Sequence, residues 1–523
     1  MVHHLEVTRQ TIQIELDARK SQAQRNRLGQ FATPAALALD VLKACKALMA
    51  LRSKISFLDP AIGTGSFYSA LLHTFSSSRI ASAVGYEIDA HYADESARLW
   101  RDTSLELHLS DFTRSKPPAF DSRPNLIVCN PPYVRHHYLE GDEKRRLQCL
   151  TADISGMRLS GLAGLYCYFL GLAHGWMADG GLAAWIVPSE FMDVNYGKVV
   201  KDYLLSKVTL HRVHRFDPNE PQFTDALVSS AVLFFTKKKP PTSHDIQLTY
   251  GGTLEHPAIG KKISAGRLTH ERKWTRYPRD DVMEGSAARL KLADFFWIKR
   301  GLASGSNEFF ILTPQEVSEH MIPLEFLTPI LPSPRHIIGE VVEGDVDGLP
   351  CLKRRLFLFG SKLDAFRIRA EFPAAWKYIE RGRTMNVHAG YLCQHRKPWY
   401  AQEERPAAPI LCTYISRLIG GRPFRFIRNR SRATANNVYL MLYPKAQLAR
   451  IAANDPTLMD RVCEALNQID GTILRREGRV YGGGLYKLEP KELANAPADT
   501  ILALVPEIKA ASVQGELFLE LNG

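Results

Sequence analysis

The sequence predicts a doubly wound α/β fold with a mostly parallel sheet, followed by a second domain of mixed α/β structure. Residues 31–240 alternate short apolar runs with amphipathic segments, which is typical of strands and helices in such a sheet. From about residue 245 this alternation stops, and aromatic residues mix with basic clusters. We therefore expect a polar helical segment over residues 1–30, a first domain over 31–240 and a second domain over 245–523. Three lysines and two prolines at residues 237–241 predict the linker.

The apolar runs of the first domain predict its strands in order. They lie at residues 55–58, 83–87, 105–109, 125–129, 182–187 and 228–235. A helix is expected to begin near Tyr68, and a strongly apolar helix is expected over residues 162–177. In open α/β sheets ligands bind at the carboxyl edge, so we expect the loops that follow these strands to form one site.

The loop after the first strand has the sequence DPAIGTGSF, residues 59–67. Gly63 and Gly65 allow a tight turn and a close approach of the backbone to a ligand. No Lys follows the glycines and a third Gly is missing, so the loop is neither a P-loop nor a dinucleotide fingerprint. The acid at its head, Asp59, suits a ligand that carries a positive amino or sulfonium group.

Acidic residues also follow the next two strands. Glu87 is placed to hold a ribose diol. Asp111 follows the strand at 105–109 and can accept a hydrogen bond from an adenine amino group, while Phe112 or Ile88 packs on the ring. Each acid alone is typical of a solvated loop, but three acids at successive strand ends favour a binding site.

Asn130-Pro131-Pro132-Tyr133 follows the strand at 125–129 and suits group transfer to a planar exocyclic amine. Such a nitrogen is a poor nucleophile because its lone pair is delocalised into the ring. The Asn130 side-chain oxygen and the Pro131 carbonyl can each accept one N–H bond, and the Tyr133 ring can stack on the base. The prolines lack an N–H and fix φ, so the loop is stiff and rich in acceptors. The alternative is an ordinary turn at a strand end, since Asn-Pro is a common turn signal.

Taken together, these motifs resemble those of the gamma-class N6-adenine DNA methyltransferases of type II restriction–modification systems, the TaqI-like group. GQFATP at residues 29–34 resembles the first motif of that family, which contacts the methionine end of S-adenosyl-L-methionine. Residues 59–67 resemble its glycine loop, Glu87 its ribose motif, residues 111–112 its adenine motif and residues 130–133 its catalytic motif. The motif order matches as well. The resemblance covers residues 25–240, and Ile62 departs from the small or polar residue that the family often has there.

The resemblance implies a seven-stranded, Rossmann-like methyltransferase sheet, S-adenosyl-L-methionine as the cofactor, and no metal. It implies cofactor contacts at Phe31, Thr33, Pro34, Asp59, Pro60, Ala61, Gly63, Gly65, Glu87, Ile88, Asp111, Phe112 and Asn130. It implies catalytic roles for Asn130, Pro131, Pro132 and Tyr133, with Phe223 as the aromatic residue that clamps a flipped-out base from its other side.

Composition agrees with a nucleic-acid enzyme of the cytoplasm. The net charge of +12 and the isoelectric point near 9.2 favour a polyanionic partner. The eight cysteines show no paired metal-ligand spacing, and Cys45, Cys129 and Cys167 lie in apolar runs that predict buried free thiols. No apolar run reaches membrane-spanning length, and the N-terminal segment lacks the apolar core of a signal peptide.

The second domain contains an arginine cluster that is a candidate for DNA binding. Arg425, Arg428, Arg430 and Arg432 have a near-alternating spacing that predicts one strand face along a phosphate backbone. Arg417 is a further candidate. Basic clusters of this kind are more often solvated faces, and the pattern does not indicate which Arg reads a base. Residues 296–307 and 475–486 are the next candidates.

We therefore predict a site-specific DNA methyltransferase that acts on the N6 amino group of adenine in double-stranded DNA. A separately encoded cognate restriction endonuclease is compatible with this prediction, and monomer and dimer both stay open. One alternative is methylation of an rRNA base or a protein glutamine, although those enzymes are usually shorter. A fused restriction–modification enzyme would need a nuclease acid pair followed by Glu-x-Lys, which no segment convincingly carries. A non-catalytic binding protein is disfavoured by the intact Asn130, Tyr133 and Asp59.

Overall fold

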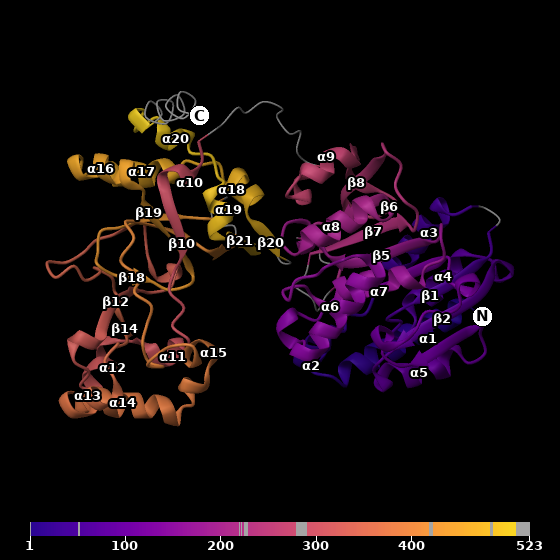
Figure 1. The fold of residues 1–523 in the computed structure, drawn as a ribbon, viewed down its shortest axis with the longest axis horizontal. Coiled ribbons are helices and arrows are strands. Elements are labelled where there is room, and N and C mark those ends of the chain that lie inside the picture. The colour runs from indigo at the N-terminus through magenta and orange to yellow at the C-terminus, as the bar shows by residue number, and fades with distance from the viewer. Residues whose placement is uncertain are drawn as a thin grey trace. The chain divides into compact units, whose positions relative to one another are not determined.

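The computed structural model describes residues 2–50, 53–218, 220, 222–223, 229–278, 290–417, 422–481 and 485–508. The chain divides into two compact units (Figure 1). The first contains Met1–Val282 and Tyr481–Gly484, and the second contains Met283–Val480 and Leu485–Gly523. Among the described helices, none combines the length and apolar character needed to cross a membrane. All eight cysteines are free, and Cys45, Cys129 and Cys167 are buried as predicted.

The first unit is built on a nine-stranded sheet in the order β3-β2-β1-β4-β5-β7-β6-β8-β9. Its strands are β1 Ile55–Asp59, β2 Ile80–Glu87, β3 Leu105–Leu109, β4 Leu126–Cys129, β5 Leu182–Pro188, β6 Thr209–Arg215, β7 Ser230–Thr236, β8 Asp245–Gly252 and β9 Pro257–Ser264. The five strands from β3 to β5 are parallel, and β7 runs antiparallel between β5 and β6. The predicted doubly wound, mostly parallel sheet is therefore confirmed.

Two details of the prediction are wrong. The sheet has nine strands instead of seven, because β8 pairs parallel with β6 and β9 pairs antiparallel with β8. Ile246, Leu248 and Tyr250 alternate along β8 and are buried, so this strand continues the apolar surface of the sheet. Residues 237–241 consequently form a loop inside the sheet and not a linker between domains. The first unit extends past residue 240 to Val282.

Helices cover both faces of this sheet, and β4 shows why. Leu126 and Val128 pack in one core, while Ile127 and Cys129 pack in the other, since successive side chains of a strand point to opposite faces. The first core holds side chains of α3 Ala35–Leu48, α4 Ser66–Thr74 and α5 Ala90–Trp100. The second holds those of α6 Gly141–Ser155, α7 Leu165–Trp176, α8 Gly197–Ser206 and α9 Ala265–His270.

The N-terminal segment is helical, as predicted, and belongs to the first unit. It forms α1 Val2–Ala18 and α2 Gln22–Leu28, and α1 packs against α4 and α5. Ser21 caps α2, and Gly29 ends it with a left-handed φ of 65°. The buried Arg9 guanidinium of α1 donates a 3.1 Å hydrogen bond to Thr64 Oγ1 in the glycine loop. The N-terminal helices are thus joined directly to the predicted cofactor loop.

The described part of the second unit contains three smaller sheets of mixed α/β structure, as predicted. Their strand orders are β10-β19-β15-β17-β13, β11-β14-β12-β18 and β16-β21-β20. The strands are β10 Phe296–Arg300, β11 Ile311–Leu312, β12 Leu327–Leu331, β13 Val341–Val342, β14 Leu356–Phe359, β15 Ile410–Thr413, β16 Ile415–Ser416, β17 Phe426–Asn429, β18 Thr434–Ala435, β19 Tyr439–Pro444, β20 Arg479–Tyr481 and β21 Leu485–Lys487. The helices are α10 Leu292–Phe295, α11 Asn307–Phe310, α12 Pro314–Glu319, α13 Ala365–Glu371, α14 Pro373–Thr384, α15 Tyr391–Gln394, α16 Ala446–Asn454, α17 Leu458–Asn467, α18 Gly471–Glu477, α19 Pro490–Ala494 and α20 Asp499–Leu502.

Candidate cofactor and substrate site

A cavity of about 250 Å³ lies at the carboxyl edge of the first unit's sheet. The loops after β1, β2, β3 and β4 all contribute to its wall, which is the arrangement that parallel strands impose. The predicted cofactor residues that line it are Phe31, Pro60, Ala61, Gly63, Glu87, Ile88, Asp111, Phe112 and Asn130. Pro132 also lines it, whereas Thr33, Pro34, Asp59, Gly65, Pro131, Tyr133 and Phe223 lie outside the wall.

The glycine loop needs both of its glycines. Gly63 and Gly65 have φ values of 55° and 90°, in the left-handed region that side chains rarely adopt. A Cβ on Gly65 would lie 2.5 Å from Trp100 Nε1, which donates a 3.0 Å bond to Thr64 O. The unusual Ile62 is accommodated because Gly85 lacks a Cβ: one there would lie 2.4 Å from Ile62 Cδ1.

Among the described residues, the two acids nearest this loop have no basic partner on their oxygens; Asp59 is buried and Glu87 is half-buried. Glu87 Oε2 accepts from the Gly63 N–H at 3.0 Å, and its Oε1 accepts from the Asp89 N–H at 2.8 Å. Asp59 is 1% exposed, and its Oδ1 accepts from the Ala61 N–H at 3.1 Å. Burial raises the pKa of Glu87, while burial and the Glu87 charge raise the pKa of Asp59 to about 8. A positively charged ligand would offset both penalties.

At the end of β3, Asp111 and Phe112 have different surroundings. Asp111 Oδ1 accepts from the N–H and Oγ1 of Thr113, both at 2.8 Å, so this side chain caps the turn that follows. Phe112 is buried and packs against Phe169 and Trp176, with ring centroids 5.6 and 5.0 Å apart. Ile88 is 66% exposed at the opening of the cavity. This end of the cavity therefore offers an apolar slot next to a carboxylate.

Asn130 has a fixed amide orientation. Its Nδ2 donates to Phe31 O at 3.0 Å and to Thr33 Oγ1 at 3.1 Å, so both N–H bonds are used within the protein. Thr33 O in turn accepts from Ser66 Oγ at 2.9 Å. Asn130 Oδ1 is buried and has no hydrogen-bond partner among the residues that the structure describes. Because an unpaired buried acceptor is costly, Oδ1 fits a ligand that donates a hydrogen bond.

The aromatic residues around the Asn-Pro-Pro-Tyr loop lie close together. The Tyr133 ring is 5.7 Å from that of Phe31 and 6.2 Å from that of Phe223, in an edge contact with an 85° interplanar angle for the latter pair. Both Tyr133 and Phe223 are buried. The structure thus brings the predicted clamp residues together, but their rings contact each other and do not form a parallel pair. Gly29 is required here, since its Cβ would lie 2.3 Å from Tyr133 N.

The contribution of α1 to the cavity wall was missed at the sequence level. Gln13 and Asp17 line the cavity; Gln13 Oε1 accepts from Thr64 Oγ1 at 2.7 Å, and Asp17 Oδ1 accepts from the Tyr92 hydroxyl at 2.9 Å. Asp89, after β2, holds the segment through Lys20 and a 2.7 Å bond from Gln30 Nε2. No motif marks these residues, because they act through contacts with segments 50 to 75 residues away.

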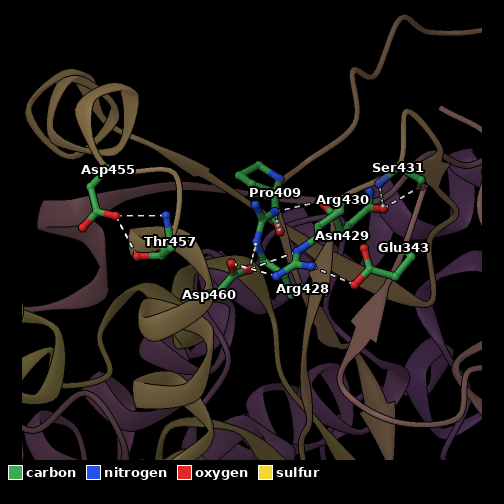
Figure 2. Close-up of polar contacts among 9 residues, drawn as sticks. All are labelled: Glu343, Pro409, Arg428, Asn429, Arg430, Ser431, Asp455, Thr457 and Asp460. Atoms are coloured by element: carbon green, nitrogen blue, oxygen red, sulfur yellow. Dashed lines mark hydrogen bonds and ion pairs between the residues drawn. The ribbon is translucent and has the colours of Figure 1, made fainter. Parts of the chain in front are cut away.

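The predicted arginine cluster of the second unit is engaged inside the protein (Figure 2). Arg428 Nε donates to Asp460 Oδ1 at 2.8 Å, and Arg430 pairs with Asp460 and Glu343 at 2.9 and 2.8 Å. Arg425 Nη2 donates to Pro334 O and Ile337 O at 2.9 and 3.1 Å. Of the four arginines only Arg428 lies in a strand, β17, so the expectation that they share one strand face is wrong. Their contact with DNA stays a prediction. Arg417 and Arg432 are exposed.

Comparison with known proteins shows similarity to restriction–modification methylases. Residues 88–223 match the family model of the Eco57I restriction-modification methylase, and residues 281–517 match that of the C-terminal domain of the type II methyltransferase M.Eco57I. The chain is 25% identical to the type II methyltransferase M.AccI of Acinetobacter calcoaceticus over 92% of this chain and 87% of that protein. It is 27% identical to M.XamI of Xanthomonas campestris pv. amaranthicola over 89% and 84%.

A solved structure shares the fold over most of the chain. The type IIL restriction-modification enzyme MmeI in complex with DNA aligns with a TM-score of 0.56 at 12% identity. The alignment covers 94% of this chain and 77% of that chain. At this identity the likeness concerns the fold alone.

Proposed function

We propose that this chain, a type II restriction–modification methyltransferase with S-adenosyl-L-methionine as its cofactor, methylates the N6 amino group of adenine at specific sites in double-stranded DNA. The observation that carries the proposal is the unpaired, buried Asn130 Oδ1. The motif order along the chain supports the gamma class of these enzymes. The sequence relationships to M.AccI and M.XamI extend over both units and support DNA as the substrate.

The cavity's chemistry fits the cofactor. When bound, S-adenosyl-L-methionine supplies a methyl group that its positively charged sulfonium makes electrophilic. The carboxyl groups of Glu87 in the wall and of Asp59 outside it would attract its positively charged end, since among the described residues neither has a basic partner. Glu87 retains acceptor capacity for ribose hydroxyls after binding two backbone N–H groups. Phe112 and Ile88 would flank the adenine ring beside Asp111.

The acceptors of the Asn-Pro-Pro-Tyr loop explain how a weak nucleophile can react. An exocyclic amine presents two N–H donors; Asn130 Oδ1 would accept one, and the Pro131 carbonyl would accept the other. Both bonds draw the lone pair back onto nitrogen and aim it into the cavity. Phe31 O and Thr33 Oγ1 hold the Asn130 amide in the required orientation before the base arrives. This preorganisation is the kind of electrostatic effect that contributes most to catalysis.

The aromatic residues would hold the flipped base. Tyr133 and Phe223 now contact each other edge to face, which buries both rings without a ligand. A base that enters from the duplex would replace this contact and stack on Tyr133. Phe223 would then pack against the opposite face of the base. We therefore expect Phe223 to move on DNA binding while Tyr133, whose N–H donates to Gly29 O at 3.1 Å, keeps its place.

The product nucleoside tests this proposal. Purified protein is incubated with S-adenosyl-L-methionine and plasmid DNA, and the DNA is then digested to nucleosides and analysed by mass spectrometry. We expect N6-methyladenine with the intact chain and at most a trace of it with Asn130→Ala. Sequencing of modified bases on the same DNA gives the recognition site. N4-methylcytosine as the sole product would contradict the base assignment, and methyl transfer to RNA or protein but not to DNA would contradict the substrate.

A further inference from the structure

Two arginines outside the predicted cluster converge on one neutral acceptor. Arg335 Nε donates to His336 Nε2 at 3.1 Å, and Arg354 Nη1 lies 3.2 Å from the same atom. Both arginines are exposed, and among the described residues neither forms an ion pair with a carboxylate. Partial desolvation and the charges of Arg354 and Arg335 lower the pKa of His336, which keeps its ring neutral and accepting. Two like charges this close together are best stabilised by a shared anion.

Arg335 lies in a first loop, residues 333–340, and Arg354 lies in a second loop, residues 343–355. Residues of the arginine cluster bind both loops. Arg425 binds the backbone of the first loop at Pro334 O and Ile337 O. Arg430 binds Glu343 at the base of the second loop, as Figure 2 shows. The Arg432 N–H donates to Gly348 O at 2.8 Å in the same loop. The arginine cluster thus stabilises the two loops, and the loops carry Arg335 and Arg354.

Both loops also present bare aliphatic side chains. Ile338 is 87% exposed and Val346 is 100% exposed. Val346 lies at the tip of a turn that is closed by a 2.9 Å bond from the Gly348 N–H to Asp345 O, with Cys351 N–H donating to Glu343 O at 2.8 Å. An aliphatic side chain in water gains free energy when a partner covers it, so both residues are available for a contact.

We propose that these two loops, residues 333–340 and 343–355, form a contact surface for duplex DNA, with Arg335 and Arg354 on a phosphate group. This inference rests on the proposed function, because it takes DNA as the substrate. A phosphate group would supply the negative partner that the guanidinium groups of Arg335 and Arg354 lack among the described residues. Val346 and Ile338 would make apolar contacts with thymine methyl groups and sugar edges in a groove. Sequence-independent phosphate contacts of this kind set the register of a protein on the duplex.

Salt dependence of DNA binding tests the surface in the full-length protein. The dissociation constant for a labelled duplex that contains the methylation site is measured at several salt concentrations for wild type, Arg335→Ala, Arg354→Ala and the double variant. Each single variant should reduce the slope of log Kd against log salt by about one, and should weaken binding about eightfold near 0.1 M salt, as the loss of one phosphate contact implies. The double variant should lose about two units of slope.

Arg367→Ala is the matched control. Arg367 is an exposed arginine of the second unit that pairs with Glu371 at 3.1 Å, so the same charge is removed from a satisfied pair. Its slope should equal that of wild type. Unchanged slopes in both Arg335→Ala and Arg354→Ala, in a protein that binds and methylates DNA, would overturn this inference alone. A wild-type protein that neither binds nor methylates DNA would overturn the proposed function instead.

Discussion

The cavity of the first unit and the arginine cluster of the second unit are both rich in polar side chains. They differ in whether those side chains have hydrogen-bond partners within the protein. Within the described part of the chain, Asn130 keeps a buried acceptor without a partner, and the acids Asp59 and Glu87 bind only backbone N–H groups. Arg428 and Arg430 instead meet Asp460, with Glu343 completing the network. A group held in readiness for a ligand has unused polar atoms, whereas a group with a structural role has its partners within the fold.

The largest effect should come from the unpaired acceptor. Asn130→Ala removes a bond that matters mainly in the transition state, so kcat should fall by about 10²–10³-fold or more. Cofactor affinity, measured by calorimetry, should stay close to that of wild type. Asn130→Asp keeps one acceptor but turns the other oxygen toward Phe31 O and Thr33 Oγ1, so an intermediate loss is expected. Near-normal methylation by Asn130→Ala would show that the cavity's free acceptor has no chemical role.

A second test uses the cost of keeping Asp59 ready for a cation. Its pKa is about 8 in the fold, against about 3.9 in an unfolded chain. The folded state therefore binds the extra proton between these values, and this group's contribution to stability is lost as pH rises from about 4 to about 8. Asp59→Asn keeps Oδ1 for the Ala61 N–H but cannot ionise. The Tm of the cofactor-free variant should exceed that of wild type, by a margin that grows from pH 5 to pH 8.

The same variant should bind the cofactor more weakly, since the positive ligand loses its carboxylate. Stability and affinity would thus change in opposite directions, as expected when a binding site stores unfavourable interactions. A Tm difference that is constant between pH 5 and pH 8 would mean that Asp59 titrates as an ordinary acid. Asp59 would then give no evidence that the cavity keeps an unfavourable group for its ligand, in contrast to the paired residues of the arginine cluster.

A smaller effect is expected at the ribose position. Glu87→Ala should weaken cofactor binding by on the order of 1–3 kcal/mol, the usual size for hydrogen bonds to a charged group. Calorimetric titration with S-adenosyl-L-methionine measures this directly, with Glu106→Ala as a control, because Glu106 is a carboxylate of the neighbouring strand that lies outside the cavity wall. Equal affinities for Glu87→Ala and wild type would remove Glu87 from the cofactor site.

The sequence predicted the cavity well because its geometry follows from local order. A strand that ends at Asp59, Glu87 or Cys129 brings the next residue to the carboxyl edge, wherever the rest of the chain lies. The orientation of the Asn130 amide was not predictable, since its partners Phe31 and Thr33 lie almost 100 residues away. The strands β8 and β9 were missed because a loop of lysines and prolines has the composition of a linker.

The arginine cluster was misread for a related reason. Its near-alternating spacing predicted one strand face, but only Arg428 lies in a strand, β17. What these side chains bind within the protein depends on acids such as Glu343 and Asp460, which lie 87 and 30 residues from Arg430 in sequence. Charge patterns therefore predict the presence of cations far better than they predict which cations are free.

The smallest effect should come from Arg430, and it separates the two kinds of site most sharply. Arg430 is 42% exposed, and Asp460 keeps Arg428 as a partner when Arg430 is removed. Arg430→Ala should therefore cost no more than about 1 kcal/mol of unfolding free energy, as is usual for a surface ion pair. Arg428→Ala should cost more, because its side chain is 14% exposed and also donates to Pro409 O and Asn429 O. Neither variant should change the salt slope of DNA binding. If Arg430→Ala lowered that slope by about one unit, Arg430 would itself contact a phosphate. An ion pair within the protein would then not exclude an arginine from contact with DNA.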